Sequence, residues 1–201
     1  MLSNFYLKIP RKVRILIIFL VIITLCYFVI RFFFVQARNV PPDFLKARQE
    51  AASIALVIVG MSDQSATNID RISELDAEHK YREALTLVTD EIQRNNEARQ
   101  KAIELSNQLE AMANNLSGIY PVSSAQVALQ AVSSETTLIS RLITYNDYLN
   151  QLLDVLRKKF AGQVDGDEVP QLVQKINNEA QAINDLNREF NDQMKIFDNA
   201  R

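Results

Sequence analysis

Few residues in this chain have types and spacings that could carry chemistry. The sequence holds one histidine, His79, and one cysteine, Cys26. One chain therefore cannot supply a histidine-rich metal site, a thiolate cluster or an internal disulfide. Asp76 and His79 have the spacing of metal ligands on one helical turn, but no second histidine completes the set. We expect His79 to be a solvated residue near a helix start, and we expect no cofactor.

A second acidic cluster is Asp165-Gly166-Asp167-Glu168, in the turn that begins at Gly162. It lacks the further spaced oxygen ligands of a calcium loop, so the sequence favours a turn in which Asp167 caps the following helix. The sequence contains no glycine-rich phosphate loop, and no base–nucleophile pair can be picked out. The prediction is a protein without catalytic residues.

One set of polar residues reaches a common height when the predicted helices are folded antiparallel. The four are Ser65, Asn95, Tyr145 and Asn177, each about 30–33 Å along its helix at 1.5 Å per residue. Two interpretations stay open. Buried polar residues can fix the register between helices, which we favour. Alternatively, the layer lines a small polar ligand pocket.

These residues must be positioned by helices, because turn-forming residues are scarce. The 201 residues include only 4 Gly and 5 Pro, which argues against a fold of many strands. Apolar residues recur every three or four positions in four segments, which we predict to be helices at about 43–75, 78–117, 123–161 and 167–198. Short connections make successive helices antiparallel, so we predict an all-α, up-down four-helix bundle over residues 43–201.

The second predicted helix has the strictest pattern. Its 4-3 alternation comprises Tyr81, Leu85, Val88, Ile92, Asn95, Arg99, Ala102, Ser106, Leu109, Ala113 and Leu116. Such a stripe suits either a closed bundle or a coiled coil with a second copy, so the oligomeric state stays open. Two local features are also predicted. Asp43 caps the first helix, and the polar patch at 133–137 bends or splits the third.

An apolar segment precedes the bundle. Residues 15–30 carry no charge, and after Arg31 the apolar character continues to Val35. At 1.5 Å per residue this segment spans about 31 Å, enough to cross a bilayer. The loose cleavage pattern Val35-Gln36-Ala37 follows three phenylalanines, which favours an uncleaved signal anchor over a cleaved signal peptide. We predict a transmembrane helix at 15–37, between a basic segment at 1–14 and a proline-containing linker at 38–42.

Charge is divided unevenly along the chain. Residues 1–42 carry six basic residues and no acidic one, whereas residues 43–201 sum to −8. The basic residues expected at the membrane interface are Arg11, Lys12, Arg14, Arg31 and Arg38. Their bias toward the N-terminal side favours a cytoplasmic N-terminus and an extracytoplasmic body, in a bacterial inner or plasma membrane. An acidic body without a basic stripe argues against nucleic-acid binding.

A signal anchor followed by a bundle of long helices resembles the LemA family and the four-helix sensor domains of bacterial receptors. The resemblance is architectural and assigns no residue a role. The expected function is a non-catalytic protein-interaction or scaffold module of the cell envelope. Its partners would be the lipid bilayer, through residues 15–37, and a protein or second copy on the bundle. The alternative is an extracytoplasmic bundle that senses a small molecule and signals through a partner.

Overall fold

The structure is a computed structural model that describes residues 39–164 and 166–199. Within these residues the chain is all-α, and its only strand-like feature is an isolated bridge between Asn39 and Tyr120. The elements are α2 (Pro42–Ala77), α3 (Tyr81–Asn114), the 3-10 helix η1 (Leu116–Gly118), α4 (Val122–Phe160) and α5 (Val169–Asn199). The predicted all-α fold with four long helices is confirmed.

The predicted membrane segment lies outside the described residues. This applies to the transmembrane helix at 15–37, to the segment at 1–14 and to the interface residues Arg11, Lys12, Arg14, Arg31 and Arg38. Among the helices that are described, none combines the length and the apolar character needed to cross a bilayer. The apolar run at 51–61, which is too short for a span, is part of α2.

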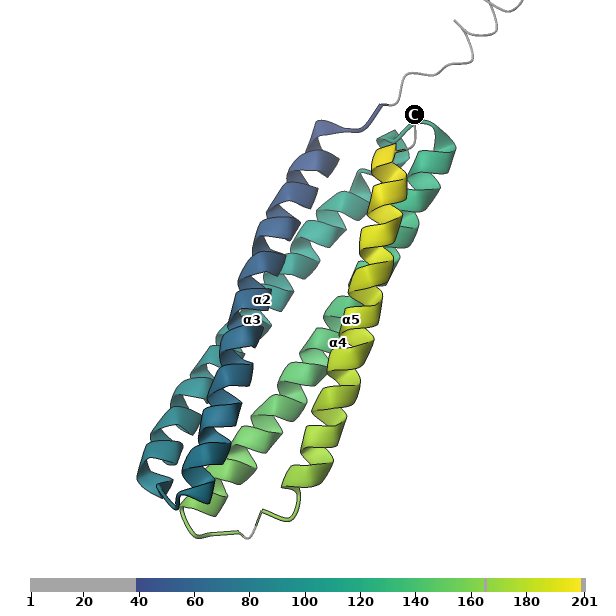
Figure 1. The fold of residues 1–201 in the computed structure, drawn as a ribbon. Coiled ribbons are helices and arrows are strands. Elements are labelled where there is room, and N and C mark those ends of the chain that lie inside the picture. Colours follow the sequence, from purple (N-terminus) through teal and green to yellow (C-terminus); the bar gives the residue numbers. More distant parts are fainter. Residues whose placement is uncertain (1–38, 165, 200–201) are drawn as a thin grey trace, which may run out of the picture. The chain divides into compact units, whose positions relative to one another are not determined.

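The helices run alternately up and down, and each packs against the next in sequence (Figure 1). The connections between α2 and α3 and between α3 and α4 are short, so successive helices must run antiparallel. Helix α5 returns to the end at which α2 begins. There the rings of Phe44 and Phe197 lie 5.6 Å apart, and Arg48 forms an ion pair with Asp198 at 2.7 Å.

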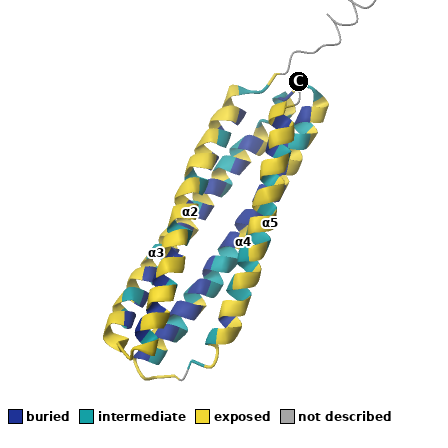
Figure 2. Cartoon of the chain, in the orientation of Figure 1, coloured by how far each residue is buried: buried dark blue, intermediate teal, exposed yellow. Residues whose placement is uncertain are grey.

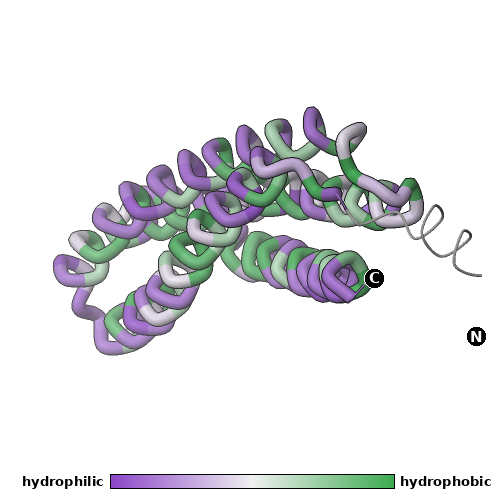
Figure 3. The backbone as a smooth tube through the Cα atoms, turned by 90° about the horizontal axis from the view of Figure 1, so that it is seen from above, coloured by the Kyte–Doolittle hydropathy of each residue, from purple (hydrophilic) through white to green (hydrophobic). Residues whose placement is uncertain are grey.

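The core consists of two apolar clusters, with polar residues between them. Buried residues lie on the inward faces of the helices (Figure 2), and hydrophilic and hydrophobic residues alternate along each helix as amphipathic packing requires (Figure 3). One cluster surrounds Phe44 and Met112; the other surrounds Ile72 and Leu153. Along α2, α3 and α4, the positions between these clusters hold the buried polar residues Ser65, Asn68, Glu91, Asn95 and Asn146.

The buried stripe of α3 differs from the predicted one at every second position. Val88, Asn95, Ala102 and Leu109 are buried as predicted. At the alternate positions the preceding residue is buried instead, namely Ala84, Glu91, Ala98, Leu105 and Met112. Arg99 and Ala113 are exposed. The reason is that α3 packs against both α2 and α4, so its buried face is centred between two neighbours rather than on its most apolar edge.

Two local predictions are wrong. Helix α4 is not split at the polar patch 133–137 but continues through it, and the hydroxyls of Thr136 and Thr137 donate to carbonyls one turn earlier. Helix α2 begins at Pro42, and no side chain caps it, so Asp43 lies in its first turn. Proline suits this place because the first turn needs no backbone N–H.

Candidate functional site: a cleft between helices α2 and α5

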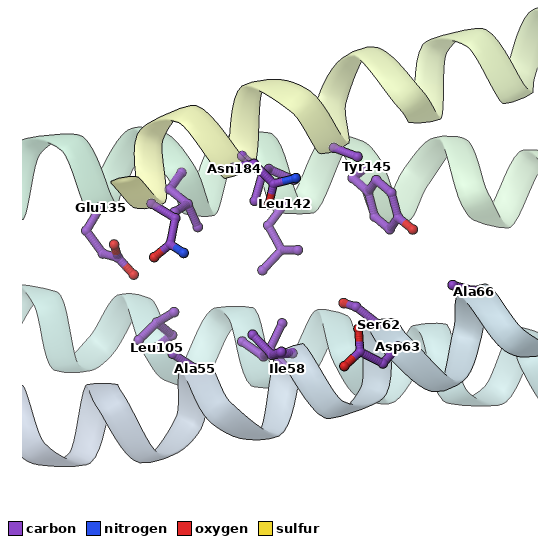
Figure 4. Close-up of a pocket in the computed structure, with 15 residues that line it drawn as sticks. Ala55, Ile58, Ser62, Asp63, Ala66, Leu105, Glu135, Leu142, Tyr145 and Asn184 are labelled. Atoms are coloured by element: carbon purple, nitrogen blue, oxygen red, sulfur yellow. The ribbon is translucent and has the colours of Figure 1, made fainter. Parts of the chain in front are cut away.

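The first and last helices, α2 and α5, enclose a cleft. The extensive contacts among the described helices are between sequence neighbours, and α2 meets α5 mainly near Phe44 and Phe197. A space of about 450 Å³ remains between them, and we call it the α2–α5 cleft. Its walls include Val59 and Asp63 from α2 and Ile183 and Asn184 from α5, with side chains of α4 and Leu105 of α3 behind (Figure 4).

Small side chains keep this cleft open. Ala52, Ala55, Ser62 and Ala66, spaced three, seven and four residues apart, lie on the face of α2 that lines the cleft and the smaller hollow adjoining it. Side chains of this size cannot reach α5. The apolar stripe predicted for α5 is consequently only half buried along its middle, at positions that include Ile183. The fourth side of the bundle is thus less tightly closed than the other three.

Glu135 of α4 lies at the junction of the cleft and the adjoining hollow, which has a volume of about 170 Å³. Its side chain is only 7% exposed, and its Oε2 atom has no hydrogen-bond partner. Burial raises the pKa of this carboxyl to about 7. The carboxylate points across the cleft toward Leu105 and Ala55 (Figure 4). The sequence analysis missed Glu135, which lies in the patch where we expected a bend.

A second buried carboxylate, Glu91 of α3, lies between the two core clusters and is fully buried. It accepts hydrogen bonds from the Ser65 hydroxyl, from Asn68 Nδ2 at 2.7 Å and from Arg94 Nε at 3.2 Å. We call these four residues the Glu91 cluster. Because two of its donors come from α2, the cluster ties α2 to α3.

Three of the four residues predicted to form a polar layer lie around Glu91. Ser65 bonds to it directly. Burial raises the pKa of Tyr145, which lines the cleft, and the negative charge of Glu91 raises it further. Asn95 donates a hydrogen bond of 2.8 Å to the backbone carbonyl of Asn146, the residue that follows Tyr145.

The fourth residue, Asn177, is exposed on α5, where its neighbour Ile176 takes the half-buried position. Ser65 and Asn95 already have partners within the protein, which agrees with a role in register. A ligand at this layer remains a prediction.

Asp76 and His79 are not joined by further metal ligands among the residues that the structure describes. His79 is exposed in the turn between α2 and α3 with φ 58°, and its ring Nδ1 lies 3.0 Å from the Tyr81 hydroxyl. The backbone N–H of Lys80 bonds to the carbonyl of Leu75, so α2 closes before His79 and α3 begins later than predicted. Within the described residues, no group of three or more His, Cys, Asp or Glu could hold a metal ion. Asp165 lies outside those residues.

The cleft can therefore hold a ligand, with apolar walls for contact area and one buried carboxylate for orientation. Comparisons with protein-family models, with curated proteins and with solved structures gave no match.

Proposed function

We propose that the protein is a non-catalytic binding module of the cell envelope, anchored in the membrane by residues 15–37, whose α2–α5 cleft takes an amphipathic helix from a partner protein. The observation that supports this proposal is the cleft itself. It is bounded by two helices and lined by apolar side chains, and exposed residues such as Val59 and Asn184 form its edges. A helix placed there would supply the packing that α2 and α5 do not give each other.

The length of the cleft suits a helix. Together with the adjoining hollow it follows α2 from Arg48 to Ala66. At 1.5 Å per residue this distance is about 27 Å, or roughly five helical turns. Helix-in-groove recognition places apolar anchors at three- and four-residue spacing along such a length. The small residues Ala52, Ala55, Ser62 and Ala66 lie along this length of α2 and would let a partner helix approach closely at those positions.

Exposed apolar side chains extend this surface along α2. Val59 is 55% exposed on the cleft wall, and Leu56, one turn earlier, is 74% exposed. Single exposed apolar residues are ordinary, but a group that borders a cleft is typical of an interaction surface. Both residues belong to the apolar run at 51–61, which is too short to be a membrane span.

The orientation in the membrane is also part of the proposal. The basic residues at 1–14 favour a cytoplasmic N-terminus and an extracytoplasmic bundle. The net charge of −8 on residues 43–201 favours a partner whose contacting surface is neutral or basic.

A second candidate function is supported by the cleft's volume. About 450 Å³ lies in the range of small-molecule sites, as a ligand-sensing bundle would require. The open edge between α2 and α5 favours the helix, because a small molecule there would stay partly in water.

The helix-docking proposal is tested by photocrosslinking in the native membrane. A photoreactive residue is placed at Val59 or at Asn187, on opposite walls of the cleft, and at Leu129 of α4 as a control. Leu129 is 54% exposed, as Val59 is, and it does not line the cleft. We expect the same protein adduct from both walls and none from Leu129.

A cleft-filling variant makes the result specific. Ala55→Trp fills the space with an indole ring, and it should remove the adducts while the helical content measured by circular dichroism stays unchanged. Adducts that persist in Ala55→Trp, or that form equally from Leu129, would contradict docking in the cleft. Their absence from both walls would contradict it as well.

A further inference from the structure

The side chains that line the α2–α5 cleft carry negative charge without a compensating cation. Glu135 and Asp63 lie among its lining residues, and no lysine, arginine or histidine does. One cation, Arg48, lines the adjoining hollow together with Glu135. Both terminal nitrogens of Arg48, however, donate to the carboxylate of Asp198 at 2.7 Å. The described residues therefore give Glu135 no ion-pair partner.

Glu135 also has an unused acceptor. It is more than nine-tenths buried, Oε2 has no hydrogen-bond partner, and the side chain is directed into the cleft (Figure 4). Buried polar atoms in folded proteins nearly always have a partner. Ser62, Tyr145, Asn184 and Asn187 line the same cleft and carry donors, but none of them forms a hydrogen bond to Glu135. An open acceptor of this kind indicates a donor that comes from outside the chain.

The surroundings define the chemistry of that donor. A metal ion would need several ligand residues, and no group of three or more suitable side chains is present among the described residues. A cationic N–H donor gains a charge-assisted hydrogen bond. An ammonium group at the end of an unbranched alkyl chain is the most compact such donor, and its three N–H groups can meet a carboxylate from several directions. The apolar residues Ile58, Leu142 and Ile183 require an aliphatic body on the same ligand.

We propose that the α2–α5 cleft binds a primary alkylammonium group, whose nitrogen donates to Glu135 Oε2 and whose carbon chain lies against Ile58, Leu142 and Ile183. The inference rests on the proposed function, in which a lysine of the docked partner helix supplies this group. The aliphatic chain of lysine would follow the apolar wall, and its charge would be neutralised at the buried end.

The test uses n-butylammonium, which has the chemistry of a lysine side chain. The full-length protein is placed in zwitterionic lipid nanodiscs at pH 8, where Glu135 is largely ionised. Binding of n-butylammonium, n-butanol and butyrate is followed by NMR through the methyl groups of Ile58, Leu142 and Ile183. We expect n-butylammonium to bind about tenfold more tightly than n-butanol, as one charge-assisted hydrogen bond provides. Butyrate should cause no shifts.

Two variants assign the effect to its residue. Glu135→Gln keeps the shape of the side chain and removes its charge, so the preference for n-butylammonium over n-butanol should disappear. Asp63→Asn is the matched control, because Asp63 lines the same cleft but is exposed to solvent. It should keep most of the preference. Equal affinities for n-butylammonium and n-butanol in the natural protein, or an unchanged preference in Glu135→Gln, would overturn the proposal.

Failure of this inference can be told apart from failure of the proposed function. If the probes bind equally but the crosslinks from Val59 and Asn187 form, the helix-binding cleft stands and the ammonium site is overturned. If the preference depends on Glu135 but neither crosslink forms, the ammonium site is supported and the docked helix is overturned.

Discussion

At the scale of single residues, Glu135 should make the stability of the bundle depend on pH. Burial raises its pKa from the ordinary 4.5 to about 7, so between these values the folded protein binds more protons than the unfolded chain. The contribution of this group to the unfolding free energy therefore falls as pH rises through this window and is constant above it. The total loss is roughly 3 kcal/mol. The ionisable groups that line the same cleft and hollow are Asp63, Tyr145 and Arg48.

Urea unfolding of the full-length protein, followed by circular dichroism at pH 4, 6 and 8, measures this effect. Glu135→Gln cannot ionise, so it should lack the decline and should be more stable than the natural protein at pH 8. Asp63→Asn provides the control, because an exposed carboxylate is not expected to produce a decline of this kind. If the natural protein and Glu135→Gln lost the same free energy between pH 4 and pH 8, the burial of Glu135 would not be the cause.

Glu91 is buried as completely, but it is surrounded by donors, and its removal should be costly. Glu91→Ala would leave the Ser65 hydroxyl and the Asn68 amide buried without an acceptor. Each unpaired group costs about 1–3 kcal/mol, so a total loss of about 2–6 kcal/mol is expected in urea unfolding. Glu97→Ala, on the exposed face of the same helix, should change the stability by less than about 0.5 kcal/mol. A comparable loss in both variants would mean that the Glu91 cluster is not the cause.

The buried acids were the residues that sequence reasoning missed. The heights of Ser65, Asn95 and Tyr145 could be predicted, because they depend only on helix rise and on the order of turns. Glu91 and Glu135 could not be found in the same way, since a glutamate beside an apolar stripe is usually solvated. The spacing of α3 did not point to Glu91 either, because the predicted 4-3 alternation from Val88 to Asn95 passes through Ile92.

At the scale of elements, the sequence defined the helices better than their faces. The buried stripe of α2 includes Phe44, Ile58, Ser65 and Ile72, which share one face at helical spacing, because α3 is the main neighbour of α2 along its length. Helix α3 has two neighbours, and its stripe is displaced toward the midpoint between them. The direction of a helix face depends on which helices surround it. A periodic pattern in one segment does not contain that information.

The incomplete burial of the apolar face of α5 also depends on which helix side chains surround it. Its apolar positions follow the predicted spacing, yet residues such as Ile183 are only half buried, because the facing side chains of α2 are small. The alanine and serine positions on α2 are visible in the sequence, and small residues on one face of a helix indicate either close helix packing or an unfilled space. Only the arrangement of α2 and α5 in the structure decides between these outcomes.

At the scale of the whole molecule, α2 and α5 are in contact near the start of α2 and the end of α5, and the α2–α5 cleft lies beside that contact. The rings of Phe44 and Phe197 pack at 5.6 Å, and Arg48 binds Asp198 with two hydrogen bonds. Farther along, α4 is the main neighbour of α5. The aromatic contact should therefore control how readily α5 separates from α2, and with it the width of the cleft.

Phe197→Ala tests this control, because Phe197 is fully buried whereas the neighbouring Ile196 is 58% exposed. Removal of the buried ring should cost about 3–5 kcal/mol in urea unfolding. It should also increase amide hydrogen exchange in α5 more than in α3, which is held on two sides. Ile196→Ala should leave the exchange in both helices nearly unchanged. A uniform increase over all four helices in Phe197→Ala would show that the bundle opens as one unit. In that case the cleft would have the stability of the whole bundle, and a partner helix could widen it only by unfolding the bundle.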